Sequence, residues 1–453
     1  MATINREPIG NLHEKIQVNL TKEDYLPSFE KSLKQYAKQA NVPGFRKGMV
    51  PTGMVRKMYG QSVFVDQVLN TAGQELDKYL KSEKLKFFGQ PMILNGEEPL
   101  KLDMNKPEDI SLNFEMGLMP EFEVAAFGKS LTRYKVTVSD KMLDDEVERL
   151  QRRFGKVESV AEVTNKENII YCTFQKAAAD GTPVADSEKV EETILMDKLP
   201  AALQEQLMGR KAGDSLLIKP VDVATAEELP VFLKQSLKAT PEEGDQPFEM
   251  TITKVGLLQP HELNQELMAQ VFPNELLDET TFRNRLREEI QKEFDRMSNE
   301  KLNNEIFETL VHETPMEFPV DFLKRWLREG QEQKKSAEEV EAGYGEFEHG
   351  LRWQIISDKL IGENELMATY DEVRGHIQQQ VLGYFGMEDA DEAPWLESYM
   401  DKMMKDEKTV NETFRRMTMD KLFQWLQTQF QISEQEVSEE EFFKTPESHH
   451  HHH

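Results

Sequence analysis

The chain has 453 residues, 55 of them basic and 83 acidic, and its formal net charge is −28. This length predicts roughly three domains, and the single cysteine, Cys172, excludes an intramolecular disulfide framework and a cysteine-based zinc site. The sequence contains no apolar run of about 18 residues, so we expect no transmembrane helix. The N-terminus lacks the apolar region of a secretory signal, so we expect a cytoplasmic protein. The net charge argues against a general binder of polyanions.

The first 125 residues combine helix and strand patterns. Apolar residues alternate with polar ones in the extended segments, and Thr21 followed by two acidic residues predicts the start of a helix. Apolar residues three and four apart, including Tyr36 and Tyr59, mark the inner faces of two helices. The predicted elements are strands over 11–20, 84–95 and 110–124, and helices from Thr21 to about Asn41 and from Pro51 to Leu80.

Residues 126–150 are expected to link this part to the helical body. Residues 151–258 show a different pattern, with short strand segments. Strands are predicted over 169–176, 215–219 and 248–255, with a short helix that begins at Pro200. Short strands around one short helix indicate a small α+β domain.

Residues 259–447 are almost wholly helical in pattern, and Pro315 and Pro319 mark helix boundaries. The last part, 434–447, holds six glutamates and one lysine, so we expect a frayed acidic tail. Residues 448–453 include five histidines that resemble a purification tag and are expected to be disordered.

Motifs for catalysis are largely missing. Gly128-Lys129-Ser130 ends like a phosphate-binding loop, but Glu123 stands where the first glycine is required. His261 and His312 each precede a glutamate without the second histidine of a zinc protease helix. We therefore expect no metal site and no cofactor. The histidines outside the tag are interpreted as isolated surface or hydrogen-bonded residues, namely His13, His261, His312, His349 and His376.

Local charge is the most informative feature of the sequence. Residues 31–65 hold seven cations and no acidic residue, a reversal of sign in a chain of charge −28. An ordinary solvated basic face is the alternative interpretation. Because Phe45 lies between Gly44 and Gly48 at the tip of a loop, with Arg46 and Lys47 beside it, we favour docking onto an RNA or mixed RNA–protein surface.

This loop, residues 41–51, resembles the signature loop of the trigger factor family, the bacterial ribosome-associated chaperones. The family pattern is Gly-Phe-Arg-x-Gly-x-x-Pro, and Met49 stands where the family usually has lysine. Weaker similarity covers residues 114–124 and 315–322, and the order of the three parts also fits. The matching residues are Gly44, Phe45, Arg46, Gly48 and Pro51.

The resemblance implies a multidomain α+β protein with three functional parts. Residues 1–125 would be an α+β domain that docks beside the exit tunnel of the large ribosomal subunit, on a ribosomal protein and rRNA. Residues 151–258 would be a degenerate FKBP-like α+β prolyl isomerase domain, and residues 259–447 an all-helical domain whose arms form a cradle for nascent chains. The expected ribosome-binding residues are Gly44, Phe45, Arg46, Lys47, Gly48, Lys38, Arg56 and Lys57.

The expected isomerase pocket is poor in aromatic residues. Catalysis of this kind desolvates and twists the prolyl amide in an aromatic pocket, without a nucleophile or metal. Leu203 and Val184 occupy two positions where the family has aromatics, and 221–226 replaces its Phe-Pro-x-x-Tyr segment. We predict weak or absent isomerase activity, and aromatics on strands are more often core than pocket. The pocket candidates are Tyr171, Phe174, Val184, Leu199, Leu203 and Phe248.

Methionines are frequent in the helical part and give a second indication of chaperone function. Flexible, polarisable methionine surfaces adapt to varied apolar partners, although helical spacing also predicts that many of these side chains fill the core. The candidates for client contact are Met297, Met316, Met400, Met403 and Met404.

The leading hypothesis is therefore a ribosome-associated, ATP-independent chaperone that binds nascent chains and assists folding. Its expected partners are the large ribosomal subunit and unfolded polypeptides, with no membrane, and the resemblance leaves room for a homodimer off the ribosome. The alternatives are a prolyl cis–trans isomerase with accessory domains, and an RNA-binding module without chaperone activity.

Overall fold

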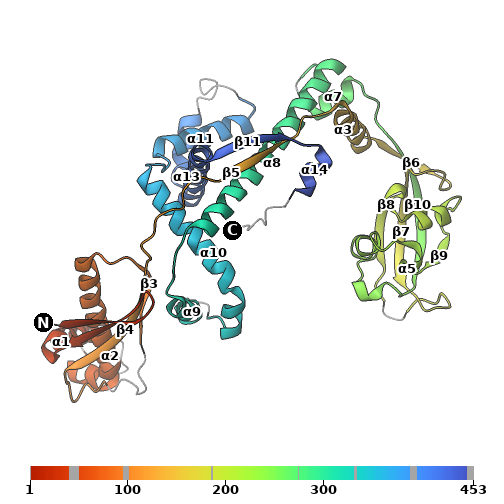
Figure 1. The fold of residues 1–453 in the computed structure, drawn as a ribbon. Helices are drawn as coiled ribbons and strands as arrows, with labels where there is room; N and C mark the ends of the chain where they lie inside the picture. The colour runs from red at the N-terminus through yellow and green to blue at the C-terminus, as the bar shows by residue number, and fades with distance from the viewer. Residues whose placement is uncertain are drawn as a thin grey trace. The chain divides into compact units, whose positions relative to one another are not determined.

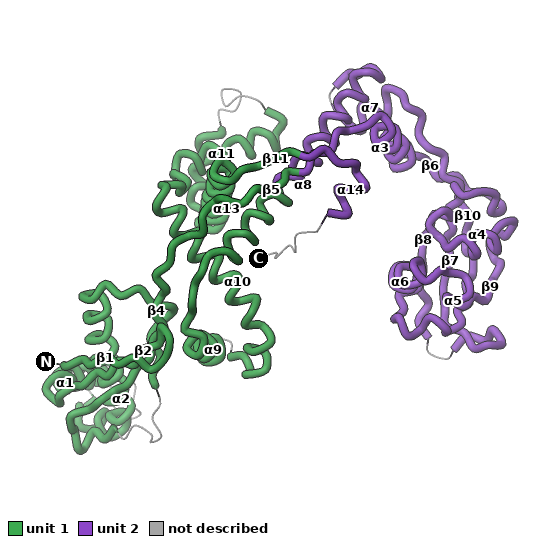
Figure 2. The backbone as a smooth tube through the Cα atoms, in the orientation of Figure 1, with its two compact units in different colours: residues 1–133, 300–434, 448–453 green, residues 134–299, 435–447 purple. Residues whose placement is uncertain are grey.

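The computed structural model describes residues 2–39, 50–94, 102–184, 187–273, 275–330, 334–387 and 395–445. The chain forms two compact units, and neither is one continuous stretch of sequence (Figure 2). Unit 1 contains residues 1–133, 300–434 and 448–453, and unit 2 contains residues 134–299 and 435–447. Within the described ranges, no helix combines the length and apolar character that a membrane crossing requires.

The N-terminal part of unit 1 is an antiparallel sheet packed against two helices (Figure 1). Its strand order is β1-β2-β4-β3, and alternation along β2 buries Ile16, Val18 and Leu20 on one face. On the two helices, Tyr25 and Phe29 both meet the ring of Phe64 edge to face. The elements are β1 (Thr3–Gly10), β2 (His13–Leu20), α1 (Lys22–Gln39), α2 (Thr52–Glu83), β3 (Phe87–Ile93) and β4 (Ile110–Leu118).

Three details of this part differ from the sequence prediction. Strand β1 is not predicted, because it lies at the edge of the sheet and is mostly exposed, so it lacks apolar alternation. Strand β4 ends at Leu118, short of the predicted Val124. Tyr36 and Tyr59 are 50% and 40% exposed, because the buried face of α1 passes through Ala37 and that of α2 through Val55 and Val63 instead.

The C-terminal part of unit 1 is helical, as predicted. The end of α8 packs with α10 and α13 around Leu302, Ile306 and Leu310, and α11 to α13 enclose a second core. Ser336 and Thr369 each begin a helix with a reciprocal capping box. The helices are α8 (Glu279–Glu313), which spans the boundary of the units, α9 (Val320–Glu329), α10 (Ala337–Glu363), α11 (Tyr370–Tyr384), α12 (Leu396–Met403) and α13 (Glu407–Gln429).

An ion pair connects α11 to α13. Lys421 on α13 donates from Nζ to both oxygens of Glu372, at 2.7 and 2.8 Å. This bond, together with the backbone N–H of Thr369, holds the pKa of the Glu372 carboxyl at about 2. The carboxylate therefore stays charged and keeps both bonds throughout the neutral and mildly acidic pH range.

Helix α9 closes the N-terminal sheet onto the helical part of unit 1. Phe322 is fully buried and lies so close to Gly117 of β4 that an added Cβ there would come within 2.5 Å of its ring. Beside it, the Glu115 carboxylate is 3% exposed, accepts a hydrogen bond from Arg325 and lies 3.0 Å from His13 Nε2. The glutamate on the sheet is thus neutralised and hydrogen-bonded by an arginine on α9.

Unit 2 contains the predicted α+β domain. Its antiparallel sheet has the order β6-β10-β7-β8, and β9 pairs with β10. Strands β7, β9 and β10 and helix α4 lie where the sequence predicts them, although β10 extends to Gln259. The elements are β6 (Lys156–Val160), β7 (Asn168–Lys176), β8 (Val190–Leu195), α4 (Ala201–Leu207), β9 (Ser215–Ile218), α5 (Pro220–Val223), α6 (Leu229–Phe232) and β10 (Phe248–Gln259).

A helical group completes unit 2. Helices α3 (Asp140–Arg153) and α7 (Gln265–Val271) pack against the first part of α8 around Phe282. The segment 126–150, expected as a linker, therefore contributes α3 and the strand β5 (Ser130–Lys135), which pairs with β11 (Gln431–Glu436).

The expectation of a frayed acidic tail is wrong. The tail contributes part of β11 and then forms α14 (Glu439–Lys444), with Ser438 as its N-cap in a capping box. Phe442 is fully buried and its ring lies 5.8 Å from that of Phe294 on α8. The expectation was based on the glutamate content alone. One buried aromatic side chain and a capping box are sufficient to hold a short helix against α8.

The contact between α9 and the sheet gives a first prediction. Arg325→Ala leaves the buried Glu115 charge without its arginine, which costs about 3 kcal/mol. We expect hydrogen exchange in α9 to accelerate strongly. The matched control is Arg328→Ala on the same helix, whose exposed pair with Glu329 contributes less than about 1 kcal/mol. Equal exchange in the two variants would contradict a stabilising role for the Glu115 contact.

Candidate functional site

Five of the seven cations of residues 31–65 lie on the second half of α1 and at the start of α2. These two helix ends flank residues 40–49, which lie outside the described residues and include the predicted Gly44, Phe45, Arg46, Lys47 and Gly48. Helix α2 starts immediately after Pro51, and Val50 before it is buried, so the chain returns to the core there. We call the following exposed group the cationic surface: Lys31, Lys34, Lys38, Arg56 and Lys57.

The lysines of the cationic surface have no carboxylate partner in the described part of the chain. Arg56 lies over the ring of Phe29 at 5.8 Å, and its Nη2 reaches the carbonyl of Met104 at 3.5 Å, which is not an ion pair either. On α8, by contrast, cations such as Lys292 and Arg296 each pair with a glutamate three residues away. The cationic surface therefore keeps its positive charge available for an anionic partner.

Exposed apolar side chains lie among these cations. The rings of Tyr36 and Tyr59 are 6.2 Å apart and join the two helices, and Met54 and Met58 are 39% and 49% exposed. Both tyrosines were predicted on buried faces, so this exposed group was not predicted. The apolar residues of α1 that recur at every fourth position and end at Ala37 indicate the other helix face as the buried one.

The isomerase-pocket candidates differ in burial and do not all lie together in unit 2. Phe174, Leu199, Leu203 and Phe248 are at most 3% exposed and belong to one hydrophobic core. Val184 is 42% exposed, whereas the half-buried Tyr171 lies under the ammonium of Lys254, 5.1 Å from its ring centroid. Four of the six candidates thus pack together in the core, two of them aromatic.

The single cysteine lies in the same domain. Cys172 on β7 is buried, and burial raises the pKa of its thiol to about 12. The thiol therefore stays protonated at neutral pH and acts as a small core side chain.

The methionine candidates for client contact are buried or half-buried. Met400 is fully buried in the core of α11 to α13, so its assignment as a client-contact residue is wrong, because helical spacing placed it on an inner face. Met403 and Met404, which lie beside it, are half-buried. Met316 in unit 1 and Met297 in unit 2 are also half-buried.

Aromatic side chains are the exposed apolar group above this core. Tyr384 at the end of α11 is 85% exposed, Phe385 50%, Trp395 37% and Tyr399 on α12 39%. Consecutive rings meet edge to face, with centroids 5.2, 4.9 and 5.7 Å apart. We call these four residues the aromatic surface. A group of four aromatic side chains left open to water is typical of an interaction site.

Models of three protein domains match the chain in sequence order. Residues 2–150 match "Bacterial trigger factor protein (TF)", residues 157–260 match "Probable trigger factor, FKBP-like domain" and residues 298–445 match "Probable trigger factor, C-terminal domain". Together they cover most of the sequence.

Curated proteins named "Trigger factor" are similar to this chain along most of its length. The protein of Salinibacter ruber is 24% identical over 392 residues, 82% of each chain, and that of Francisella tularensis is 23% identical over 430 residues, 91% of this chain and 90% of its own. A solved structure described as "Promiscuous Substrate Recognition in Folding and Assembly Activities of the Trigger Factor Chaperone" is 17% identical, with a TM-score of 0.39, and covers 94% of this chain and all of its own.

A second prediction distinguishes core from pocket in unit 2. Phe174→Ala removes a fully buried ring and is expected to destabilise the domain by about 3–5 kcal/mol. Val184→Ala is the matched change at the exposed candidate and should cost less than about 1 kcal/mol. Hydrogen exchange in β7 and β10 measures both. If Phe174 instead lined a solvent-filled pocket, its substitution would leave exchange in these strands almost unchanged.

Proposed function

Because this chain belongs to the trigger factor family, we propose that it is a cytoplasmic, ribosome-associated, ATP-independent chaperone that binds nascent polypeptides and assists their folding. The observation that carries this proposal beyond the family match is the cationic surface, whose lysines lack carboxylate partners among the described residues of a chain with net charge −28.

The cationic surface supports docking to the large ribosomal subunit. Lysine ammonium groups and the Arg56 guanidinium bind phosphate oxygens of RNA, and the release of counterions drives this contact. The exposed rings of Tyr36 and Tyr59 add apolar and stacking contacts, which suit a surface composed of protein and RNA. Residues 44–48, which connect the two helices in sequence and lie outside the described residues, would contact the rRNA and a ribosomal protein.

The charge of the remaining chain supports a single mode of docking. Since residues 31–65 carry seven cations and no anion, the other parts of the chain hold all 83 acidic side chains. These parts are repelled by rRNA phosphates, whereas the cationic surface is attracted. The distribution of charge therefore orients the chaperone and keeps its other surfaces available to the emerging chain.

The aromatic surface supports client binding. Its four side chains can bury large apolar areas of an unfolded chain at low cost in side-chain entropy. The neighbouring Met387, Met403 and Met404 pack on the core beneath it and are flexible enough to adapt to different clients. We infer that the aromatic surface is a main contact for nascent chains in unit 1.

Prolyl isomerisation as the main activity is the weaker alternative, since most of the pocket candidates are core residues. An RNA-binding module without chaperone activity would leave the aromatic surface unexplained. A homodimer off the ribosome stays a prediction.

The docking proposal predicts a defined loss. Changing Phe45, Arg46 and Lys47 together to Ala should lower affinity for large ribosomal subunits by about 100-fold or more, because phosphate and apolar contacts are lost together. Co-sedimentation of the full chain with purified subunits measures the effect. Undiminished co-sedimentation would contradict docking through this loop.

Salt dependence gives a sharper form of the same experiment. Replacing Lys34, Lys38 and Lys57 by Ala should reduce the slope of log affinity against log salt by about 2, since each phosphate contact contributes about 0.7–0.9. The matched control removes three cations elsewhere in the same domain, at Lys78, Lys81 and Lys86, and should keep the original slope. Equal slopes for both variants would show that net charge alone governs binding.

Client binding predicts a loss that is independent of the ribosome. Phe385→Ser with Trp395→Ser should raise the concentration needed to suppress aggregation of a denatured protein by about 30-fold, since each of the two aromatic contacts contributes about 1 kcal/mol. The control Leu276→Ser changes a side chain that is 96% exposed but isolated. Equal protection by both variants would exclude the aromatic surface as a main contact.

The isomerase prediction is tested with a proline-containing peptide. In the presence of the full chain, cis–trans conversion should stay close to its uncatalysed time of tens to hundreds of seconds, because the pocket candidates lack exposed aromatics. A turnover comparable to that of an active FKBP would overturn this prediction.

A further inference from the structure

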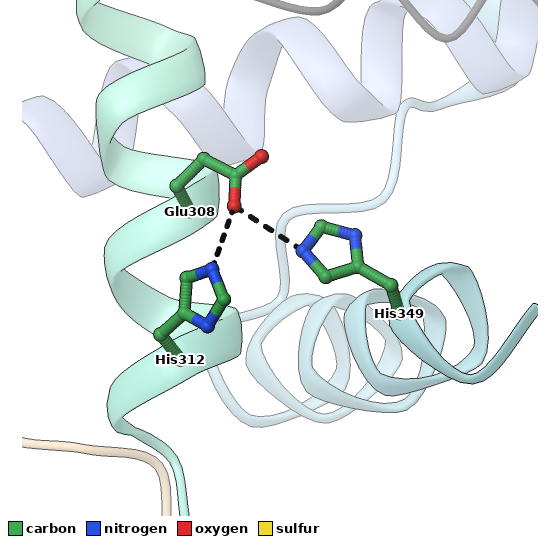
Figure 3. A group of neighbouring side chains, drawn as sticks. All are labelled: Glu308, His312 and His349. Atoms are coloured by element: carbon green, nitrogen blue, oxygen red, sulfur yellow. Dashed lines mark hydrogen bonds and ion pairs between the residues drawn. The ribbon is translucent and has the colours of Figure 1, made fainter. Parts of the chain in front are cut away.

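Two histidines and a glutamate meet between α8 and α10, at positions that the sequence analysis considered separately (Figure 3). Glu308 and His312 are one turn apart on α8, and His349 comes from α10. Glu308 Oε2 lies 3.2 Å from Nε2 of each histidine. Among the described residues, this is the one group of three potential metal ligands whose donor atoms all lie within 4.8 Å of one another.

The fold orients these side chains before any ligand arrives. Leu302, Ile306 and Leu310 turn one face of α8 into a core shared with α10, which brings the adjacent face of α8, with Glu308 and His312, next to α10. The ring of His349 is held edge to face by Phe307 at 5.2 Å, and Phe307 in turn meets Trp353 at 5.0 Å. Figure 3 shows the imidazole nitrogens and the carboxylate directed at one another.

The donor set and spacing suit a divalent transition-metal ion. Two imidazoles and a carboxylate are ligands of Zn²⁺ and related ions. In a tetrahedral site with metal–ligand distances of about 2.0–2.2 Å, neighbouring donor atoms lie about 3.3–3.5 Å apart, close to the 3.2 Å between Glu308 and each histidine. A neutral imidazole binds a metal ion through Nε2 when its proton is on Nδ1, so small side-chain rotations would let the ion lie between these three donor atoms.

The surroundings leave room for the remaining ligand. His312 and His349 line a pocket of about 500 Å³. Arg352 in the pocket wall is engaged by Glu348 at 3.0 Å and by the carbonyl of Thr314 at 3.2 Å, so its charge is largely compensated. Water or a donor group of another molecule can therefore complete the coordination from the pocket side.

We propose that Glu308, His312 and His349 form a binding site for a Zn²⁺-type divalent transition-metal ion, with three protein ligands and one position open to the pocket. The bound ion joins α8 to α10 and stabilises the helical part of unit 1, because it binds the folded arrangement and not the unfolded chain.

The test uses the chain that ends at Ser448, since the five terminal histidines bind the same ions. Titration with Zn²⁺ alone, followed by calorimetry, should give one equivalent bound and a higher melting temperature. Co²⁺ in place of Zn²⁺ should give the visible absorption bands of a four-coordinate cobalt ion. Absence of stoichiometric Zn²⁺ binding by this chain overturns the proposal.

Variants identify the ligands. His312→Gln changes a side chain that is 71% exposed, so the fold is retained, and it should weaken Zn²⁺ binding by about 100-fold, as should His349→Ala. The control His376→Ala changes a histidine that contacts Arg416 instead and should leave the affinity unchanged. Binding that survives both ligand variants, or that is lost in the control, contradicts the assignment.

Discussion

The buried carboxylate of Glu115 accepts a hydrogen bond from Arg325, which lies 210 positions later in the sequence. A carboxylate that is 3% exposed is stable only when it is hydrogen-bonded and neutralised, and here the Arg325 guanidinium does both. With Phe322 packed against Gly117 beside it, this contact joins the N-terminal sheet to the helical part within unit 1. The cationic surface and the aromatic surface consequently belong to one compact unit.

The two surfaces differ in the forces they use. The cationic surface acts through charge, which makes its affinity dependent on salt and suits a partner rich in phosphate. The aromatic surface acts through burial of apolar area, which tolerates many sequences and persists at high salt. A protein that holds both can attach to a constant partner and accept varied clients without a nucleotide to drive release.

Much of the fold follows from periodicity and capping. The helices α1 and α2 and the strands β2, β7, β9 and β10 lie close to their predicted positions, because each has one clear buried face. Edge strand β1 and helix α14 were missed, since neither shows that pattern. The metal-ligand group could not be predicted, because His312 and His349 become neighbours only when α8 and α10 pack. Tyr36 and Tyr59 were misassigned because a spacing of three or four residues fits more than one helix face.

The assignment of two separate surfaces is tested most directly with a photo-crosslinker at Lys57 or at Phe385, one at a time, in full chains bound to ribosomes that carry a nascent polypeptide. We expect position 57 to crosslink to rRNA or a ribosomal protein and position 385 to crosslink to the nascent chain. Crosslinks from position 385 to the ribosome alone, or none from position 57 to the ribosome, would contradict this assignment.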